Sequence, residues 1–306
     1  MDTGNTARNE PWLAIAGIML VIAGMQVFII QPGFMTVLVS ALQLTEAWAG
    51  YVASAEMCGI PIATIATAAV GHRLNWRRAV AISALILASA DLLSIFAHTP
   101  LQFLAVRAVA GLGAGVLISI GYSLVGMARN ADKFFGYAIM ALLGYGAIGV
   151  FILPWSEEAV GLAGILVALA VIAILPLLLL RKLPARTAVD TVMESPVGAA
   201  PKPHNTLAVI LALCAVAIFF LGQGVVWAYL GLIGTAAGVP DQSVATGLAL
   251  SQVAGMVGAF GMAWLSGRVS QRGYPLLGLV VDSEVARTFE RGTSTWRHAI
   301  GPSVEL

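Results

Sequence analysis

Long apolar runs separated by short polar breaks follow one another along most of the chain. A helix needs about 20 apolar residues to cross a hydrocarbon core about 30 Å thick, so each run is long enough for one crossing. The breaks are charged or rich in turn-forming residues, which places helix ends between the runs. The pattern predicts an all-α, polytopic membrane protein with spans at residues 12–39, 48–70, 79–97, 101–126, 135–154, 160–180, 207–233 and 243–265.

The first apolar run is too long for one straight crossing. Gln31-Pro32-Gly33 interrupts it, and a proline removes a backbone N–H from a helix, so we expect a kink or an early exit from the membrane there. The run also exceeds the apolar core of a cleavable signal peptide, which is about 7–15 residues long. The first helix is therefore expected to serve as the insertion signal.

Cations and acids are separated between alternate loops. Short cytoplasmic loops collect Lys and Arg, and twelve cations lie in the N-terminal segment or in every second loop after it: Arg8, Arg73, Arg77, Arg78, Arg129, Lys133, Arg181, Lys182, Arg186, Lys202, Arg268 and Arg272. The intervening loops hold Glu46, Glu157, Glu158 and Asp241 and neither Lys nor Arg. This separation predicts eight spans with a cytoplasmic N-terminus, in the plasma membrane (the inner membrane of a bacterium).

The composition agrees with a bilayer as the solvent. Hydrophobic residues make up 59% of the chain and charged residues 10%, against about 25% charged residues in an average soluble domain. A net charge of +1 offers no basic face for nucleic acid. Cys58 and Cys214 lie within apolar runs, and the four histidines are far apart in sequence. We expect no disulfide, metal or cofactor.

The longest loop divides the chain into two sets of helices. Residues 181–206 include four prolines, which predicts a flexible cytoplasmic linker. It separates a six-helix bundle, 1–180, from a partial second bundle, 207–281, and a polar cytoplasmic tail, 282–306. Weak symmetry relates the two sets, because Glu56 lies over Gln252 at a shift of 196 residues and Gln26 over Gln223 at a shift of 197. Internal repeats are frequent in secondary transporters.

The repeat length sets an expectation for the end of the chain. Two copies of such a unit need about 390 residues, and the chain has 306. Residues 276–281 resemble the opening of a ninth span, but residues 282–306 contain seven charged residues and no apolar run. We therefore expect the second bundle to be incomplete, as a frameshift or an early stop would leave it.

Two short motifs accompany this layout. Residues 267–273, GRVSQRG, are similar to the loop signature G-x-L-A-D-R-x-G-R-R, with Gln271 in the place of the acid, and residues 71–78 form a degenerate copy without the Asp. Residues 107–113, RAVAGLG, are similar to R-x-x-Q-G-x-G, with Ala110 in the place of Gln. Together with six helices, a linker and a parallel second set, they give residues 11–279 a resemblance to the major facilitator superfamily.

The resemblance implies a substrate cavity between two helix bundles and a cytoplasmic gate. The gate residues that it implies are Gly71, Arg73, Arg77, Arg78, Gly267, Arg268, Arg272 and Gly273. The alternative is that these arginines only set the topology. The spans that the resemblance places around the cavity carry polar or amphipathic side chains at Gln26, Gln31, Tyr122, Tyr145, Gln223, Trp227, Tyr229 and Gln252. These are candidate substrate contacts, although such residues also lie at membrane interfaces or bridge helices.

Three ionisable residues lie within the predicted spans: Glu56, Asp91 and Arg107. A charge at the centre of a spanning helix costs about 2.5–3.5 kcal/mol, so such residues are functional candidates. Their positions predict a similar depth in the outer half of the membrane. Either Arg107 forms a structural ion pair with one acid, or Glu56 or Asp91 exchanges a proton during transport while Arg107 controls its ionisation. The resemblance favours Glu56, because it places span three, with Asp91, outside the bundle.

Three functions follow from these patterns. The first is a secondary active transporter of a small solute, coupled to protons, that alternates access between two bundles. The chain has no G-x-x-x-x-G-K-[ST] loop for direct ATP drive. An intramembrane enzyme needs a catalytic cluster that the scattered histidines do not supply. The third is an inactive product or an assembly partner without transport, because eight helices could not close a cavity built from twelve.

Overall fold

The computed structural model describes residues 11–71, 73–128, 130–184 and 206–265. These residues form seven α-helices and one 3-10 helix and contain no strand. The helices are α2 (Pro11–Leu42), α3 (Glu46–Val70), α4 (Trp76–Ser94), α5 (Pro100–Gly126), α6 (Ala131–Ile174), η1 (Leu175–Lys182), α8 (Thr206–Ala236) and α9 (Asp241–Leu265). The prediction of an all-α chain is confirmed.

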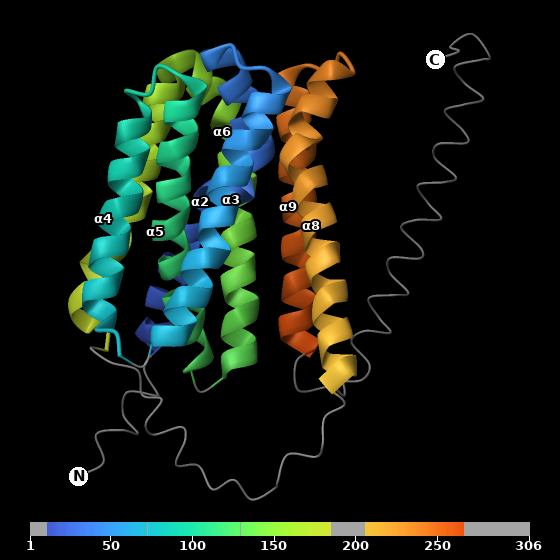
Figure 1. Cartoon of the computed structure of the whole chain (residues 1–306). Coiled ribbons are helices and arrows are strands. Elements are labelled where there is room, and N and C mark those ends of the chain that lie inside the picture. Colours follow the sequence, from blue (N-terminus) through green and yellow to red (C-terminus); the bar gives the residue numbers. More distant parts are fainter. Residues whose placement is uncertain (1–10, 72, 129, 185–205, 266–306) are drawn as a thin grey trace, which may run out of the picture. The chain divides into compact units, whose positions relative to one another are not determined.

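Two compact units divide the chain, residues 1–260 and 261–306. The second unit lies almost wholly outside the described residues, and the packing below belongs to the first. Within it, helices that follow one another along the chain run in opposite directions (Figure 1). The short connections between α2 and α3, between α4 and α5 and between α8 and α9 therefore lie at one end of the bundle.

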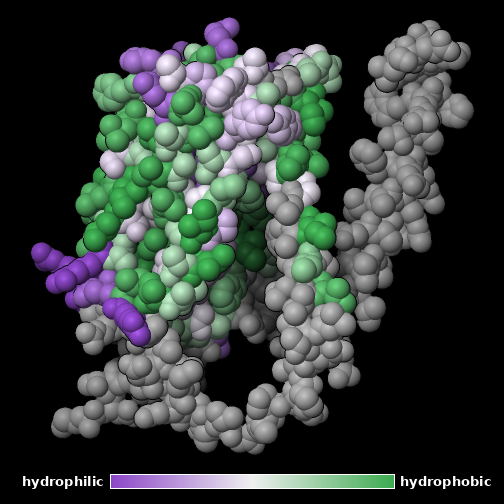
Figure 2. Space-filling view, viewed as in Figure 1, coloured by the Kyte–Doolittle hydropathy of each residue, from purple (hydrophilic) through white to green (hydrophobic). Residues whose placement is uncertain are grey.

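Within the part of the chain that the structure describes, five stretches of helix are long and apolar enough to cross a membrane. They are Trp12–Leu42, Ala47–Val70, Pro100–Gly126, Lys133–Arg181 and Asp241–Gly261. Figure 2 shows apolar side chains over much of the visible face and strongly hydrophilic ones toward its ends. Many large apolar side chains are exposed, among them Ile65 and Leu178, as expected where lipid is the solvent. The chain is a membrane protein.

The spans predicted at 135–154 and 160–180 are the two parts of α6 together with η1. α6 is broken at Gly161, where φ is 63° and ψ is −174°, a conformation that glycine adopts without the steric cost of a Cβ. Figure 1 shows the chain reversing direction between the two parts. Beyond the break the chain packs against α4, and η1 lies against α2 and α4.

The proline of α2 does not end the helix, which continues through Pro32 to Leu42. The helix itself therefore does not end at the proline, and the point at which the chain leaves the membrane stays a prediction. Pro32 has no N–H, so the carbonyl of Phe28, four residues earlier, lacks its partner within the helix. Trp227 Nε1 of α8 donates a hydrogen bond to this carbonyl at 3.0 Å. The break in the α2 ladder thus becomes an attachment point for α8.

A second donor binds the neighbouring carbonyl. Gln252 Nε2 of α9 donates to the Ile29 carbonyl at 3.2 Å, and the Gln252 side chain is buried. The backbones of α2 and α8 also meet closely, since a Cβ at Gly231 would lie 2.3 Å from the Pro32 carbonyl oxygen. Two side chains and one backbone contact therefore hold α8 and α9 against the same turn of α2.

Glycines bring α3 and α5 into backbone contact. A Cβ at Gly111 would lie 2.2 Å from the Glu56 carbonyl oxygen, and one at Gly115 would lie 2.3 Å from that of Ile60. Small residues allow such approach in membranes, where packing rather than the hydrophobic effect associates helices. This contact fixes the position of Glu56 on α3 relative to the residues of α5.

Gly111→Ala is expected to lower the free energy of unfolding by about 1–3 kcal/mol, as overpacking does. The obstructing atom belongs to the α3 backbone, so no side-chain rotation can relieve the contact. Thermal unfolding in detergent measures the effect. The control is Gly222→Ala in α8, where a Cβ meets nothing within 4 Å and helix propensity favours alanine. Equal melting temperatures for the two variants would contradict the tight α3–α5 contact.

Candidate functional site

Four helices contribute side chains to one buried polar cluster: Gln26 from α2, Glu56 from α3, Asp91 from α4 and Arg107 from α5. Arg107 Nη2 donates to Asp91 Oδ1 at 2.7 Å. Gln26 Nε2 donates to Asp91 Oδ2 at 2.9 Å. Both carboxylate oxygens of Asp91 are therefore bound, and the Arg107 and Asp91 side chains are fully buried.

Glu56 is held more loosely than Asp91. Its Oε2 lies 3.7 Å from Arg107 Nη1, which is longer than a hydrogen bond. Within the described residues, Nη1 and Nε of Arg107 have no hydrogen-bond partner. The Phe103 ring centroid lies 5.9 Å from the guanidinium carbon, within the reach of a cation–π interaction of about 6 Å. Arg107 thus has one tight carboxylate partner and one at longer range.

The ends of α4 and α5 set the depth of this cluster. Thr99 and Gln102 form a capping box at the start of α5, and Pro100 occupies its first turn, where the missing N–H costs nothing. Arg107 follows about two turns later, whereas Asp91 lies three residues before the end of α4. Only residues 95–99 separate the two helices, so both side chains reach the same level.

The charges of the cluster do not cancel when every group is ionised. Glu56 and Asp91 then carry two negative charges against one on Arg107, and one bound proton makes the cluster neutral. An unpaired charge is costly in the interior. The arrangement is therefore suited to holding one exchangeable proton, and Glu56, the acid farther from the guanidinium, is the better placed to exchange it.

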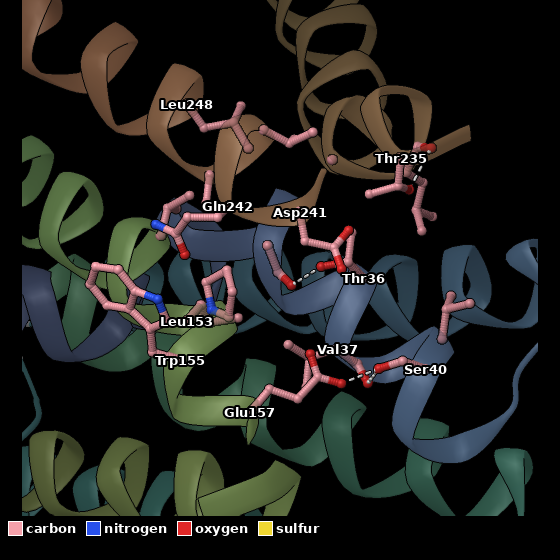
Figure 3. A pocket seen from close by; sticks show the side chains of 18 of the residues that line it. Thr36, Val37, Ser40, Leu153, Trp155, Glu157, Thr235, Asp241, Gln242 and Leu248 are labelled. Carbon is pink, nitrogen blue, oxygen red and sulfur yellow. Dashed lines mark hydrogen bonds between the residues drawn. The ribbon is translucent and has the colours of Figure 1, made fainter. Parts of the chain in front are cut away.

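A cavity of about 660 Å³ lies between α2, α6, α8 and α9 (Figure 3). Its lining includes residues on both sides of the turn that joins α8 to α9. Its polar lining residues are Thr36, Ser40, Glu157, Glu158, Thr235, Asp241 and Gln242. Among the described residues, the lining contains no Lys, Arg or His. The volume falls within the range of small-molecule pockets, about 300–1,000 Å³.

Figure 3 shows how the acids of the cavity lie. Glu157 points toward Ser40 of α2, and Asp241 lies in the first turn of α9. Ser40 Oγ donates a hydrogen bond to the Glu157 carboxylate. Gln242 Nε2 donates to the Phe151 carbonyl at 3.4 Å, whereas its buried Oε1 has no partner among the described residues.

None of the eight candidate substrate contacts lines this cavity. Gln26 belongs to the buried cluster, and Trp227 and Gln252 bind carbonyls of α2. The other five lie elsewhere: Tyr122 stacks on Phe135, Gln31 is buried, Gln223 is exposed, and Tyr145 and Tyr229 pack against the apolar core. Their role in substrate binding stays a prediction.

From the sequence, the acids of the cavity are recognisable only as residues of the loops that hold neither Lys nor Arg. Glu157 and Asp241 are far apart in sequence and come from different predicted spans. Three acids in loops assigned to the same side of the membrane were the available signal.

The gate residues implied by the resemblance fall partly within the described chain. Arg77 Nε donates to the Leu183 carbonyl at 2.6 Å, which joins the start of α4 to the end of η1. Gly71 follows the last residue of α3, the Arg73 N–H donates to the Val70 carbonyl, and the Arg78 N–H donates to the Asn75 side chain that caps α4. The second set, Gly267, Arg268, Arg272 and Gly273, lies outside the described residues.

No protein-family model matches the chain, and no curated protein matches its sequence. Among the described residues, no group of three or more His, Cys, Asp or Glu side chains is arranged to hold a metal ion. The buried cluster and the acidic cavity are therefore the two sites from which a function can be argued.

Proposed function

We propose that the chain is a secondary active transporter that moves a small solute across the plasma membrane, coupled to protons, by alternating access between two helix bundles. The observation that carries the proposal is the buried cluster of two carboxyl groups and one guanidinium. Ionisable side chains inside a membrane are costly, and those that persist there mark proton and substrate pathways.

The two acids of the cluster take different parts in the proposed coupling. Asp91 accepts hydrogen bonds from both Arg107 and Gln26 and acts as the fixed counter-ion. Glu56 is the mobile acid, because it lies 3.7 Å from the guanidinium without a direct hydrogen bond to it. A proton on Glu56 leaves the cluster neutral, and its release restores an excess negative charge. Each proton thus changes the attraction between α3 and α5.

The proposed orientation has a cytoplasmic N-terminus, eight spans and a first bundle made of α2 to η1. Two features support it. Ser40, Glu157 and Asp241, from three connections assigned to the outer side, come together around one cavity. Arg77, from a connection assigned to the cytoplasm, binds the carbonyl of Leu183 near the start of the predicted linker. Solute and protons would then be exchanged between the two sides.

Glu56→Gln is expected to abolish proton-coupled transport, because glutamine cannot release a proton. The full-length chain is reconstituted in proteoliposomes with an inward acid gradient, and solutes accumulated from a metabolite mixture are identified by mass spectrometry. The wild type is expected to accumulate at least one solute, and a protonophore to abolish the accumulation. Infrared difference spectra across a pH titration should contain the band of a protonated carboxyl group, and the variant should lack it.

Glu56→Asp serves as the matched control, because it keeps a carboxyl group at the same position of the buried cluster. It should keep both the accumulation and the infrared band. A wild type without proton-dependent accumulation would overturn the transport proposal. Unchanged accumulation and an unchanged band in Glu56→Gln would exclude Glu56 as the proton carrier.

A further inference from the structure

The described lining of the cavity between α2, α6, α8 and α9 carries negative charge without a balancing cation. Glu157, Glu158 and Asp241 supply the charge, and the described lining residues include no Lys, Arg or His. The hydrogen bond from Ser40 to Glu157 orients the carboxylate without neutralising it. A positively charged ligand is the complement of this surface.

The position of two of these acids adds to the imbalance. Glu157 and Glu158 lie in the last turn of the first part of α6, just before the break at Gly161. A helix C-terminus carries a partial negative charge, so acids there are unfavourable for the helix. Of the three acids, only Asp241 is favourably placed in its own helix, because it lies in the first turn of α9, at the positive end of the helix dipole. Glu157 and Glu158 thus weaken their own helix, which points to a ligand that makes use of their charge.

Gln242 adds a neutral polar group to the lining. Its Nε2 donates to the Phe151 carbonyl, which orients the amide. Its Oε1 is unpaired among the described residues and is itself buried, and a buried acceptor is costly unless a donor reaches it. The amide therefore keeps an unused acceptor close to the carboxylates of the cavity.

The remaining walls are apolar and aromatic. Val37, Leu153 and Leu248 line the cavity. The Trp155 side chain is about half exposed, and its ring is held edge-on against Phe151 with 5.0 Å between ring centroids. Tryptophan is the best partner for a cation over its ring face. Apolar walls suit an organic ion, and the three acids are not arranged to hold one metal ion among the described residues.

We propose that this cavity binds an organic cation of drug-like size, an amine or quaternary ammonium with an aromatic or alkyl body. Such cations are then the solute class of the transporter, an identification that rests on the transport function proposed above. Binding to the cavity does not depend on the transport function, because the carboxylates and the Trp155 ring would act without a proton gradient.

Ethidium is a suitable probe, since it is an aromatic cation whose fluorescence rises in an apolar site. Titration into the purified full-length chain in lipid nanodiscs should give saturable binding. The double variant Glu157→Gln/Asp241→Asn should weaken affinity at least about tenfold, or ~1.4 kcal/mol. The aromatic anion 1-anilinonaphthalene-8-sulfonate should show no loss of binding in the double variant.

A second measurement does not require the acids to be replaced. With Cys58 and Cys214 changed to alanine, Thr235→Cys places a thiol in the cavity lining, and ethidium should slow its reaction with a maleimide. Absence of saturable binding to the wild type, or equal affinity in the double variant together with no protection of the thiol, would overturn the inference. Proton-dependent accumulation of solute without ethidium binding would contradict the cation site but not the transport function. Ethidium binding without accumulation would support the cation site and contradict the transport function.

Discussion

Replacing Arg107 with methionine is expected to lower the free energy of unfolding by about 3–5 kcal/mol, the range measured when one partner of a buried ion pair is removed. The variant leaves Glu56 and Asp91 buried together without a cation, and the hydrogen bond to Asp91 Oδ1 is lost. Gln26 remains as the donor to Oδ2. The expected loss exceeds that for a packing change because two like charges remain.

The triple variant Glu56→Gln/Asp91→Asn/Arg107→Met tests whether the lost stability comes from unbalanced charge or from the different size and packing of methionine. It has the same methionine but no charge, so most of the lost stability should return. Thermal unfolding in detergent, with steric trapping in lipid for the free energy, measures all three proteins. A triple variant as unstable as Arg107→Met would show that the size and packing of arginine, rather than charge balance, stabilise the four helices.

The helices of this chain could be predicted from sequence because the bilayer imposes a strict length on each apolar run. The predicted span 101–126 and the observed α5, Pro100–Gly126, differ by one residue. The predicted break between spans five and six, residues 155–159, ends two residues before the observed break at Gly161. Two neighbouring signals lie there, Pro154 and Gly161, and the proline is accommodated within α6 while the glycine breaks it. Packing against neighbouring helices decides between such signals.

The buried cluster was accessible to sequence reasoning because charged residues are rare in the spans. Glu56, Asp91 and Arg107 were expected at one depth, and both carboxyl groups lie within 4 Å of the Arg107 guanidinium. The part played by Gln26 was not foreseen, since nothing local distinguishes a glutamine that binds an acid from one that faces a cavity. The acidic cavity was missed for a related reason: its charge comes from separate connections that only the folded chain brings together.

One hydrogen bond of α8 could not be predicted from the sequence, although the proline that frees its acceptor is evident there. A proline at position 32 leaves the carbonyl four residues earlier without a donor, so a partner for Phe28 was to be expected. The partner, Trp227, lies 199 residues away, and no periodic pattern connects the two. Trp227 and Gln252 were singled out as polar residues for a substrate, yet the structure shows their donors bound to α2.

Removing both donors, as Trp227→Phe/Gln252→Leu, is expected to cost about 1.5–4.5 kcal/mol. About 1–3 kcal/mol comes from the Phe28 carbonyl left without a partner and about 0.5–1.5 kcal/mol from the lost hydrogen bond of Gln252. Tests of each single variant give the separate contributions by thermal unfolding. The two bonds differ in origin, because only the Phe28 carbonyl was freed by the proline. The Ile29 carbonyl can still accept a bond within α2.

Pro32→Ala distinguishes these origins. An alanine restores an N–H at position 32, which can satisfy the Phe28 carbonyl within α2. In that background Trp227→Phe should cost little, whereas Gln252→Leu should cost as much as before. A double-mutant cycle therefore predicts strong coupling between Pro32 and Trp227 and weak coupling between Pro32 and Gln252. Equal coupling for both pairs would show that α8 and α9 are held by packing around the proline as a whole. In that case the freed carbonyl would not explain why a tryptophan lies at position 227.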